Sequence, residues 1–125
     1  MGKFAVYVSD KGARFNLKAG NGEVIATSQM YKSLKSCLAG VESVRKNAPI
    51  AALENQTVEG FEVCKHPKFE VYADKAGKAR FRLKAKNGQI VAVSQGYKTV
   101  KSCLSGIESV RKNAADSPVV EETEE

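Results

Sequence analysis

One segment of 21 residues occurs twice in this chain of 125 residues. Residues 28–48 read SQMYKSLKSCLAGVESVRKNA, and residues 94–114 read SQGYKTVKSCLSGIESVRKNA, 66 positions later and with 16 identities. A duplicated unit predicts a fold in which two similar halves pack against each other. A half of this size would bury only about 60% of its unfolded surface by itself. We therefore expect the two halves to share one core.

Three strands are predicted ahead of each repeated segment. Apolar and polar residues alternate in six short stretches, as is typical of strands with one buried face. The stretches are residues 3–8, 14–19 and 23–28 in the first half and 68–73, 80–86 and 89–94 in the second. Asn21-Gly22 and Asn87-Gly88 are strong hairpin-turn signals between the second and third stretches. Each half thus begins with a predicted three-stranded antiparallel meander.

The repeated segment then changes to helical periodicity. Ser33 is a suitable N-cap for the first helix, and the second runs over residues 99–113. Two apolar stripes follow this spacing: Leu34, Cys37, Leu38, Val41 and Val44, then Val100, Cys103, Leu104, Ile107 and Val110. Gly40 and Gly106 lie inside the helices, at a cost of about 1 kcal/mol relative to alanine. We expect the helix backbone to approach the sheet or the other helix closely there.

The segments after the helices are predicted as fourth strands. Residues 51–57 and 117–123 align at the same offset and are partly apolar, so each half reads β-β-β-α-β. Residues 58–65 also have strand character. We place the first repeat, with its connecting segment, at residues 1–66 and the second at residues 67–120. Residues 121–125 are expected to form a disordered acidic tail.

The pattern FxVYxDKxGxxRFxLKAxNGxxxxxSxxYKxxxSCxxGIESVRKNA, present in both halves, resembles the YegP-like family of small uncharacterised bacterial proteins. The resemblance implies an α+β fold of two tandem β-β-β-α-β repeats related by a pseudo-twofold axis. Each antiparallel meander would pack against one helix, and strands would be exchanged between the repeats. A tandem chain would then be a monomer that contains its own pseudo-dimer. The resemblance implies a domain of unknown function, with no established reaction, cofactor or partner.

The net charge of +6 is unevenly distributed along the chain. Four of the last five residues are glutamates, so residues 1–120 carry 20 basic against 10 acidic side chains, a net +10. Such a body attracts polyanions or acidic protein surfaces. We therefore expect a non-catalytic interaction or accessory protein that presents a basic surface to a protein partner or polyanion. A solvated surface with a solubilising tail is the simpler interpretation.

One candidate surface is the strand at residues 80–86. Alternation predicts Arg80, Arg82, Lys84 and Lys86 on one face, spaced by about 7 Å as phosphate contacts. Tyr72 on the same face would add a platform for a base. Nucleic-acid binding through this face is therefore the alternative function. Glu70 and Asp74 on the adjacent strand would instead make it an ion-paired, solvated face.

A second candidate surface lies at the starts of the two helices. Its residues recur in both copies: Tyr31, Lys32 and Lys35, then Tyr97, Lys98 and Lys101. Gln29/Gln95, Glu42/Glu108 and Arg45/Arg111 recur with them. Local capping and pairing explain such a set structurally. The functional interpretation is a pair of identical binding surfaces for a protein or a small anion.

No set of residues predicts catalysis or metal binding. His66 is the single histidine, and Cys64 and His66 would supply only two ligands where a zinc site needs three or four. No phosphate-binding glycine motif occurs. We expect no enzyme activity, cofactor or metal. Three cysteines without a framework, and no signal peptide or membrane-length apolar run, predict reduced thiols in a cytoplasmic protein.

Overall fold

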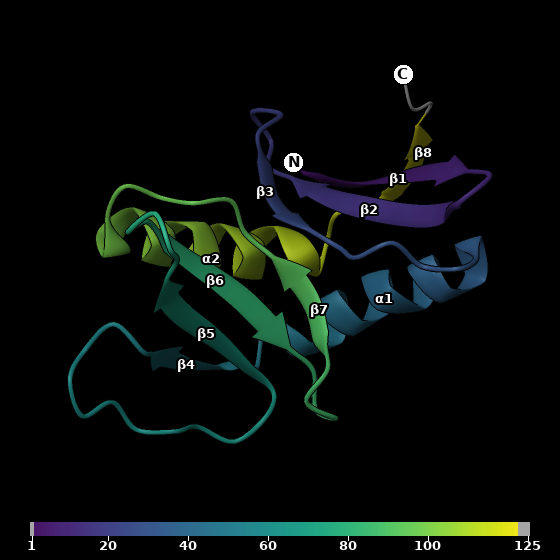
Figure 1. Ribbon diagram of the computed structural model, residues 1–125. Coiled ribbons are helices and arrows are strands. Elements are labelled where there is room, and N and C mark those ends of the chain that lie inside the picture. The colour runs from purple at the N-terminus through teal and green to yellow at the C-terminus, as the bar shows by residue number, and fades with distance from the viewer. Residues whose placement is uncertain (1, 123–125) are drawn as a thin grey trace.

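The computed structural model describes residues 2–122 as an α+β fold (Figure 1). The first half contains β1 (Lys3–Ser9), β2 (Gly12–Lys18), β3 (Val24–Thr27), α1 (Leu34–Asn47) and β4 (Ala52–Asn55). The second half contains β5 (Lys68–Ala73), β6 (Ala79–Lys84), β7 (Ile90–Val93), α2 (Val100–Ala114) and β8 (Val119–Glu122). The strands predicted for both meanders and the two predicted helices are confirmed.

The strands form a single mixed sheet in the order β4-β5-β6-β7-β3-β2-β1-β8. Strands within each meander are antiparallel, and the two meanders meet where Thr27 of β3 pairs with Val93 of β7. The fourth strands are parallel to their neighbours: β4 pairs with β5, and β8 pairs with β1. Each fourth strand therefore lies beside the first strand of the other half.

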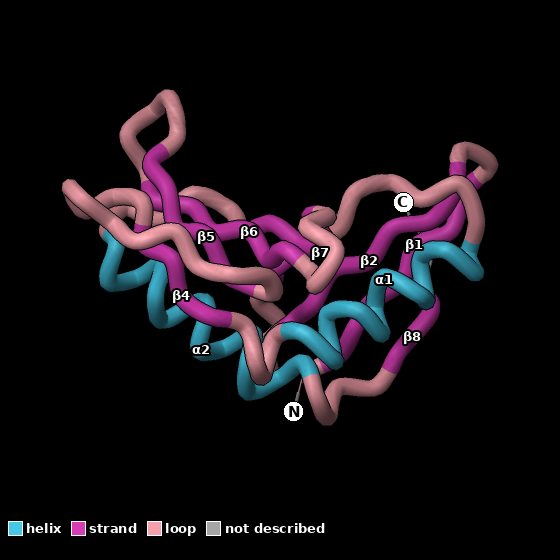
Figure 2. Tube along the Cα trace, turned by 90° about the horizontal axis from the view of Figure 1, so that it is seen from below, coloured by secondary structure: helices cyan, strands magenta, loops and turns pink. Residues whose placement is uncertain are grey.

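Both helices lie on one face of the sheet (Figure 2). Their C-terminal ends come together near the centre, while their N-terminal ends point to opposite sides of the molecule (Figure 1). α1 contacts β2 of its own half and β7 of the other, and α2 contacts β6 and β3 in the same way. Because each helix packs against strands from both halves, neither half has a separate core.

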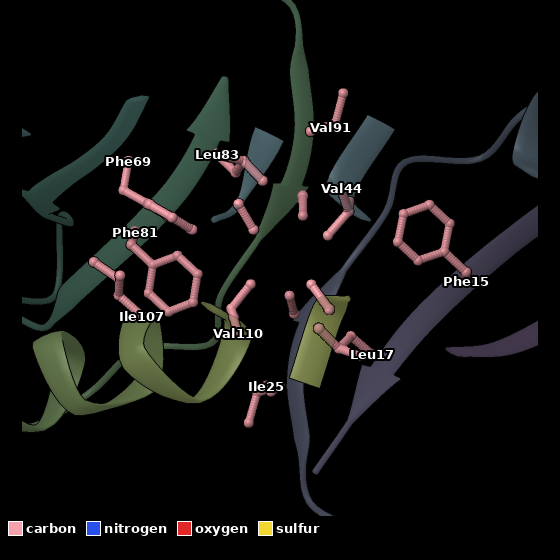
Figure 3. Packing of buried hydrophobic residues seen from close by; sticks show 14 of the residues in the cluster. Phe15, Leu17, Ile25, Val44, Phe69, Phe81, Leu83, Val91, Ile107 and Val110 are labelled. Atoms are coloured by element: carbon pink, nitrogen blue, oxygen red, sulfur yellow. The ribbon is translucent and has the colours of Figure 1, made fainter. Parts of the chain in front are cut away.

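The core is one continuous cluster of buried apolar side chains. Phe69, Phe81 and Ile107 occupy one side of it and Phe15 and Leu17 the other (Figure 3). All four phenylalanines of the inward-facing strand positions are fully buried: Phe4, Phe15, Phe69 and Phe81. The expectation that the halves share a core is confirmed, since this cluster includes residues from both.

The helix ends follow from local chemistry. The hydroxyl oxygens of Ser33 and Thr99 accept hydrogen bonds from the backbone N–H of Ser36 and Ser102, which satisfies donors that a helix start leaves unpaired. The predicted apolar stripe of α1 is only partly right. Leu34 and Leu38 are 38% and 37% exposed, because the buried face is centred on Cys37, Val41 and Val44 and continues to Asn47.

Gly40 and Gly106 allow the close approach to the sheet that was expected, at Phe15 and Phe81, but the nearest group is a tyrosine that precedes each helix. A side-chain carbon on Gly40 would lie 2.4 Å from the hydroxyl oxygen of Tyr31, and Gly106 relates to Tyr97 in the same way. Tyr31 stacks on Phe15 with ring centroids 6.4 Å apart. The two tyrosines ahead of the helices therefore have a packing role, with their rings against the helix glycines.

Two predictions, one about the segment between the halves and one about the C-terminal tail, are wrong. Residues 58–65 form no strand; they lie in the long connection between β4 and β5. The acidic tail does not start at residue 121, because Glu121 and Glu122 belong to β8 and pair with β1. Glu122 forms ion pairs with Lys3 and Lys18, which accounts for a glutamate in this strand. The rest of the predicted tail, residues 123–125, lies outside the described residues.

Candidate functional site

The basic row of β6 is largely neutralised by acidic neighbours. Nε of Arg80 lies 2.7 Å from Asp74 Oδ2, and Nε of Arg82 lies 2.5 Å from Glu70 Oε1. Lys84 Nζ lies 3.2 Å from Glu70 Oε2. Lys86 follows the end of the strand and is exposed. Arg80, Arg82 and Lys84 therefore share one face as predicted, and of the two interpretations of this row the structure favours the ion-paired one. Lys86 lies next to Lys46 and Asn47 of α1 instead.

Tyr72 lies on the same face as this row, as predicted, but its ring is already occupied. The Arg82 guanidinium carbon lies 4.4 Å from the centroid of the Tyr72 ring, a cation–π contact. Tyr7 of β1 is covered by Arg14 in the same manner, at 4.6 Å. A stacking platform for a base would require the arginine to leave.

A buried ionic network, which the sequence did not indicate, adjoins this face. Lys68 Nζ lies 2.8 Å from Glu54 Oε1 and 3.2 Å from Glu70 Oε2, and all three side chains are almost fully buried. Burial acts to raise the pKa of Glu70, but hydrogen bonds from Arg82, Lys84 and Lys68 outweigh it and lower that pKa. The three carboxylate and ammonium groups thus stay charged in the folded protein.

The connection between β4 and β5 closes over this network. Glu54 accepts hydrogen bonds from Gln56 Nε2 and from the backbone N–H of Cys64, both at 2.7 Å. Burial acts to raise the pKa of Glu54, but these bonds and that from Lys68 lower it to about 2. The ionised carboxylate therefore ties the connection to the sheet, which is a structural role for this cluster.

The lysines at the helix starts remain exposed. Lys32 and Lys35 of the first half and Lys98 and Lys101 of the second have no hydrogen-bond or ion-pair partner among residues 2–122. The two pairs lie at opposite ends of the molecule, where α1 and α2 begin (Figure 1). Tyr31 and Tyr97, predicted to join this surface, instead pack against the helices and are half-buried.

The recurring arginines at the helix ends have a structural explanation. Arg45 forms an ion pair with Glu42 and donates to the carbonyl of Ser117 at 2.6 Å. Arg111 is 3.3 Å from Glu108 and donates to the carbonyl of Ala48 at 3.4 Å. Each arginine thus joins its own helix to the segment that follows the other helix.

The residues considered for chemistry do not converge. The His66 imidazole lies beside Gly88 at the β6–β7 turn, and Cys64 lies by the edge of β4. No group of three or more histidine, cysteine, aspartate or glutamate side chains suited to a metal occurs within residues 2–122. All three cysteines are free. None of the helices in the described part of the chain is long and apolar enough to cross a membrane.

Comparison with known proteins gives consistent matches along the chain. A family model for a domain of unknown function, DUF1508, matches residues 9–54 and 74–121. A UPF0339 protein in the 5′ region of the ptx operon of Stutzerimonas stutzeri is 43% identical over 121 residues, 96% of each chain. A UPF0339 protein of Treponema denticola is 63% identical over 54 residues, which is 43% of this chain but 93% of that one.

The fold also matches a solved structure. The solution NMR structure of yegP from Escherichia coli, a protein of unknown function, superposes with a TM-score of 0.79. It is 38% identical in sequence, and the match covers 99% of this chain and 95% of that one. The resemblance noted in the sequence is therefore confirmed over both halves.

Proposed function

The chain belongs to the DUF1508 family of unknown function. We propose that it is a non-catalytic binding protein. It would present a pair of lysines at the start of each helix to an acidic partner protein. The four side chains are those of Lys32, Lys35, Lys98 and Lys101, here called the helix-start lysines. We further propose a cytoplasmic location, which the three free cysteines support.

The observation that carries this proposal is the position of Lys35 and Lys101. Each lies in the first turn of its helix, and neither helix has an acidic residue in that turn. A cation at this end opposes the helix dipole at a cost of about 0.3–1 kcal/mol. Helix stability therefore does not account for lysine at this position in both halves, whereas binding of an acidic partner does.

The arrangement of the lysines favours a protein over a nucleic acid. Two pairs at opposite ends of the molecule make separate patches rather than a continuous track for a phosphate backbone (Figure 1). The one row with the spacing of such a track, on β6, is ion-paired with Asp74 and Glu70. An acidic protein surface needs only one local patch.

We also propose that the chain acts as a monomer with an internal pseudo-twofold, two β-β-β-α-β repeats that exchange their fourth strands. The pairing of β4 with β5 and of β8 with β1 supports this. The match of a whole Treponema denticola relative to less than half of this chain supports it as well. A partner would then meet two nearly equivalent patches, one on each half.

Fluorescence anisotropy with labelled poly-L-glutamate, over a series of salt concentrations, tests the proposal. Two exposed ion pairs in each patch, at about 0.2–1 kcal/mol each, predict that K32Q/K35Q/K98Q/K101Q lowers the affinity of each patch about twofold to 30-fold. A matched variant, K11Q/K65Q/K75Q/K112Q, removes the same charge from other exposed positions and should lose much less. Labelled oligo(dT) serves as the nucleic-acid probe.

Three outcomes would contradict the proposal. Equal losses in the two quadruple variants would mean that only net charge matters. Unchanged affinity in the helix-start variant would exclude these lysines. Tighter binding of oligo(dT) than of poly-L-glutamate, lost in R80Q/R82Q, would favour the β6 face and a nucleic-acid function instead.

A further inference from the structure

A groove runs between α1 and the hairpin that joins β6 to β7. It consists of two adjoining cavities of about 350 and 180 Å³, which share Ser43, Ala85 and Asn87 in their walls. None of the helix-start lysines lines either cavity. Cavities of a few hundred Å³ are in the range that binds small molecules.

The larger cavity is cationic. Lys46 of α1 and Lys86 of the hairpin line it from its two walls, together with the amide side chains of Asn47 and Asn87. Neither lysine has an acidic partner among residues 2–122. Ile50, 65% exposed, provides an apolar rim. Two unpaired cations beside amide groups are suited to a carboxylate, which accepts hydrogen bonds from both.

The smaller cavity has an apolar and rigid wall. Tyr31, Gly40 and Val91 line it, and the Tyr31 ring is fixed between Phe15 and the helix backbone at Gly40. Ala85, in the wall shared by both cavities, continues this apolar surface toward the lysines. An apolar or aromatic body extending from the cationic end would contact it.

We propose that this groove, the α1–hairpin groove, binds a small organic carboxylate. The carboxylate lies between Lys46 and Lys86, and its apolar or aromatic body extends along Ala85 toward Tyr31 and Val91. The groove combines α1 of the first half with the β6–β7 hairpin of the second half. The proposal of a ligand site in this groove does not depend on the helix-start lysines.

The equivalent place between α2 and the β2–β3 hairpin explains why one site is expected and not two. At the constant offset of 66 residues, Asp116 corresponds to Ile50 and Gly20 corresponds to Lys86, while Lys112 corresponds to Lys46. The charged residues of the groove are thus two lysines, but those of its counterpart are a lysine and an aspartate. The counterpart lacks both the net positive charge and the apolar rim.

Binding can be followed in the intact chain by ¹H–¹⁵N NMR with 2-naphthoate as the probe. We expect saturable shifts at Ser43, Asn47 and residues 85–87, a stoichiometry of one, and no shifts at Ser109 and Asn113. The neutral 2-naphthamide should bind about twofold to 30-fold more weakly, because it cannot pair with the two exposed lysines.

Exchange of residues between the two halves provides matched variants. I50D/K86G gives the groove the residues of its counterpart, which the fold already accommodates, and should weaken 2-naphthoate binding about twofold to 30-fold. G20K/D116I makes the reverse exchange and should create a second site, with shifts at Ser109 and Asn113. K32Q/K35Q/K98Q/K101Q should bind 2-naphthoate like the parent chain.

The proposal is overturned by any of three results. These are no saturable binding of 2-naphthoate, shifts centred away from the groove, or equal affinity in I50D/K86G. Equal affinity for 2-naphthamide would likewise show that the lysines do not select a carboxylate. Loss of 2-naphthoate binding leaves the poly-L-glutamate result unaffected, so the two proposals can fail separately.

Discussion

Alanine at Gly40 should destabilise this protein, although alanine is the better helix former. Replacing a glycine inside a helix normally stabilises it by about 1 kcal/mol. Here the added carbon would lie 2.4 Å from Oη and 2.8 Å from Cζ of Tyr31, and 3.2 Å from Cε2 of Phe15. These separations are below contact distance, so the tyrosine ring has to shift.

The expected magnitude follows from opposing contributions. Overpacking of a tight site costs about 1–3 kcal/mol, and partial loss of the Tyr31–Phe15 stack costs about 0.5–1.5 kcal/mol. After subtraction of the helix-propensity gain, the free energy of unfolding should fall by about 0.5–3.5 kcal/mol. For a chain of this length, each kcal/mol lowers Tm by about 4 °C.

Urea unfolding followed by circular dichroism measures the effect, with the slope against urea checked for constancy. G106A should behave like G40A, because Tyr97 has the same place relative to Gly106. S105A is the matched control: Ser105 is exposed, its counterpart is Ala39, and this change should be neutral or slightly stabilising. In G40A/Y31L the loss should be smaller than the sum of the single losses. A G40A protein as stable as the parent chain would refute the packing explanation.

Two further predictions concern charge. The pKa of Glu54 is about 2 in the folded protein, below its ordinary value of 4.5, so its contribution to stability is present above about pH 4.5 and is lost as the pH falls toward 2. Urea midpoints of E54Q should therefore change less over this range than those of the parent chain, and an unchanged pH dependence would contradict the assignment. K35E/K101E should raise the unfolding free energy by about 0.5–1 kcal/mol per helix, because an acidic side chain suits the helix start. K46E/K112E, in the last turns, should lower it; thermal unfolding of both variants gives the comparison, and equal shifts would contradict the dipole explanation.

The elements could be predicted because their signals are local. Alternation marked the meander strands, Asn-Gly pairs marked the hairpin turns, and Ser33 and Thr99 marked the helix starts. Gly22 and Gly88 adopt φ of 86° and 85°, the conformation that such turns require. The strand prediction for residues 58–65 is wrong because a short apolar run does not distinguish a strand from a loop.

Contacts between the halves could not be read from local spacing. The pairing of Glu42 with Arg45 is visible as a three-residue separation, but the bond from Arg45 to Ser117 spans 72 positions. For the β6 face, the cross-strand pairing of Arg82 with Glu70 was one of two interpretations, and the structure favours it. The buried Glu54–Lys68 pair could not be predicted without knowing that β4 lies beside β5 and that the connection between them covers the pair.

Where the two halves differ in charge, residues that contact one another differ together. On β4, β5 and β6, three residues lie side by side across the strands: Glu54, Glu70 and Arg82. The equivalent residues on β8, β1 and β2 are uncharged: Val120, Ala5 and Asn16. A buried carboxylate is tolerated only when a group of opposite charge pairs with it, so the glutamates of this set require the basic side chains beside them.

The connection between β4 and β5 explains where the charged set lies. It donates a hydrogen bond to Glu54 and covers that side of the sheet, so the carboxylates beneath it are withdrawn from water and must be paired. The helix ends are held alike in both halves, because Arg45 and Arg111 each bond to the segment after the other helix. The differences that change a charge thus lie on the outer sheet face, in the hairpins and in the segments after the helices, whereas the repeated helix segments differ only at uncharged positions. The α1–hairpin groove joins one of these hairpins to the helix of the other half and has no equivalent counterpart, whereas the helix-start lysines occur twice.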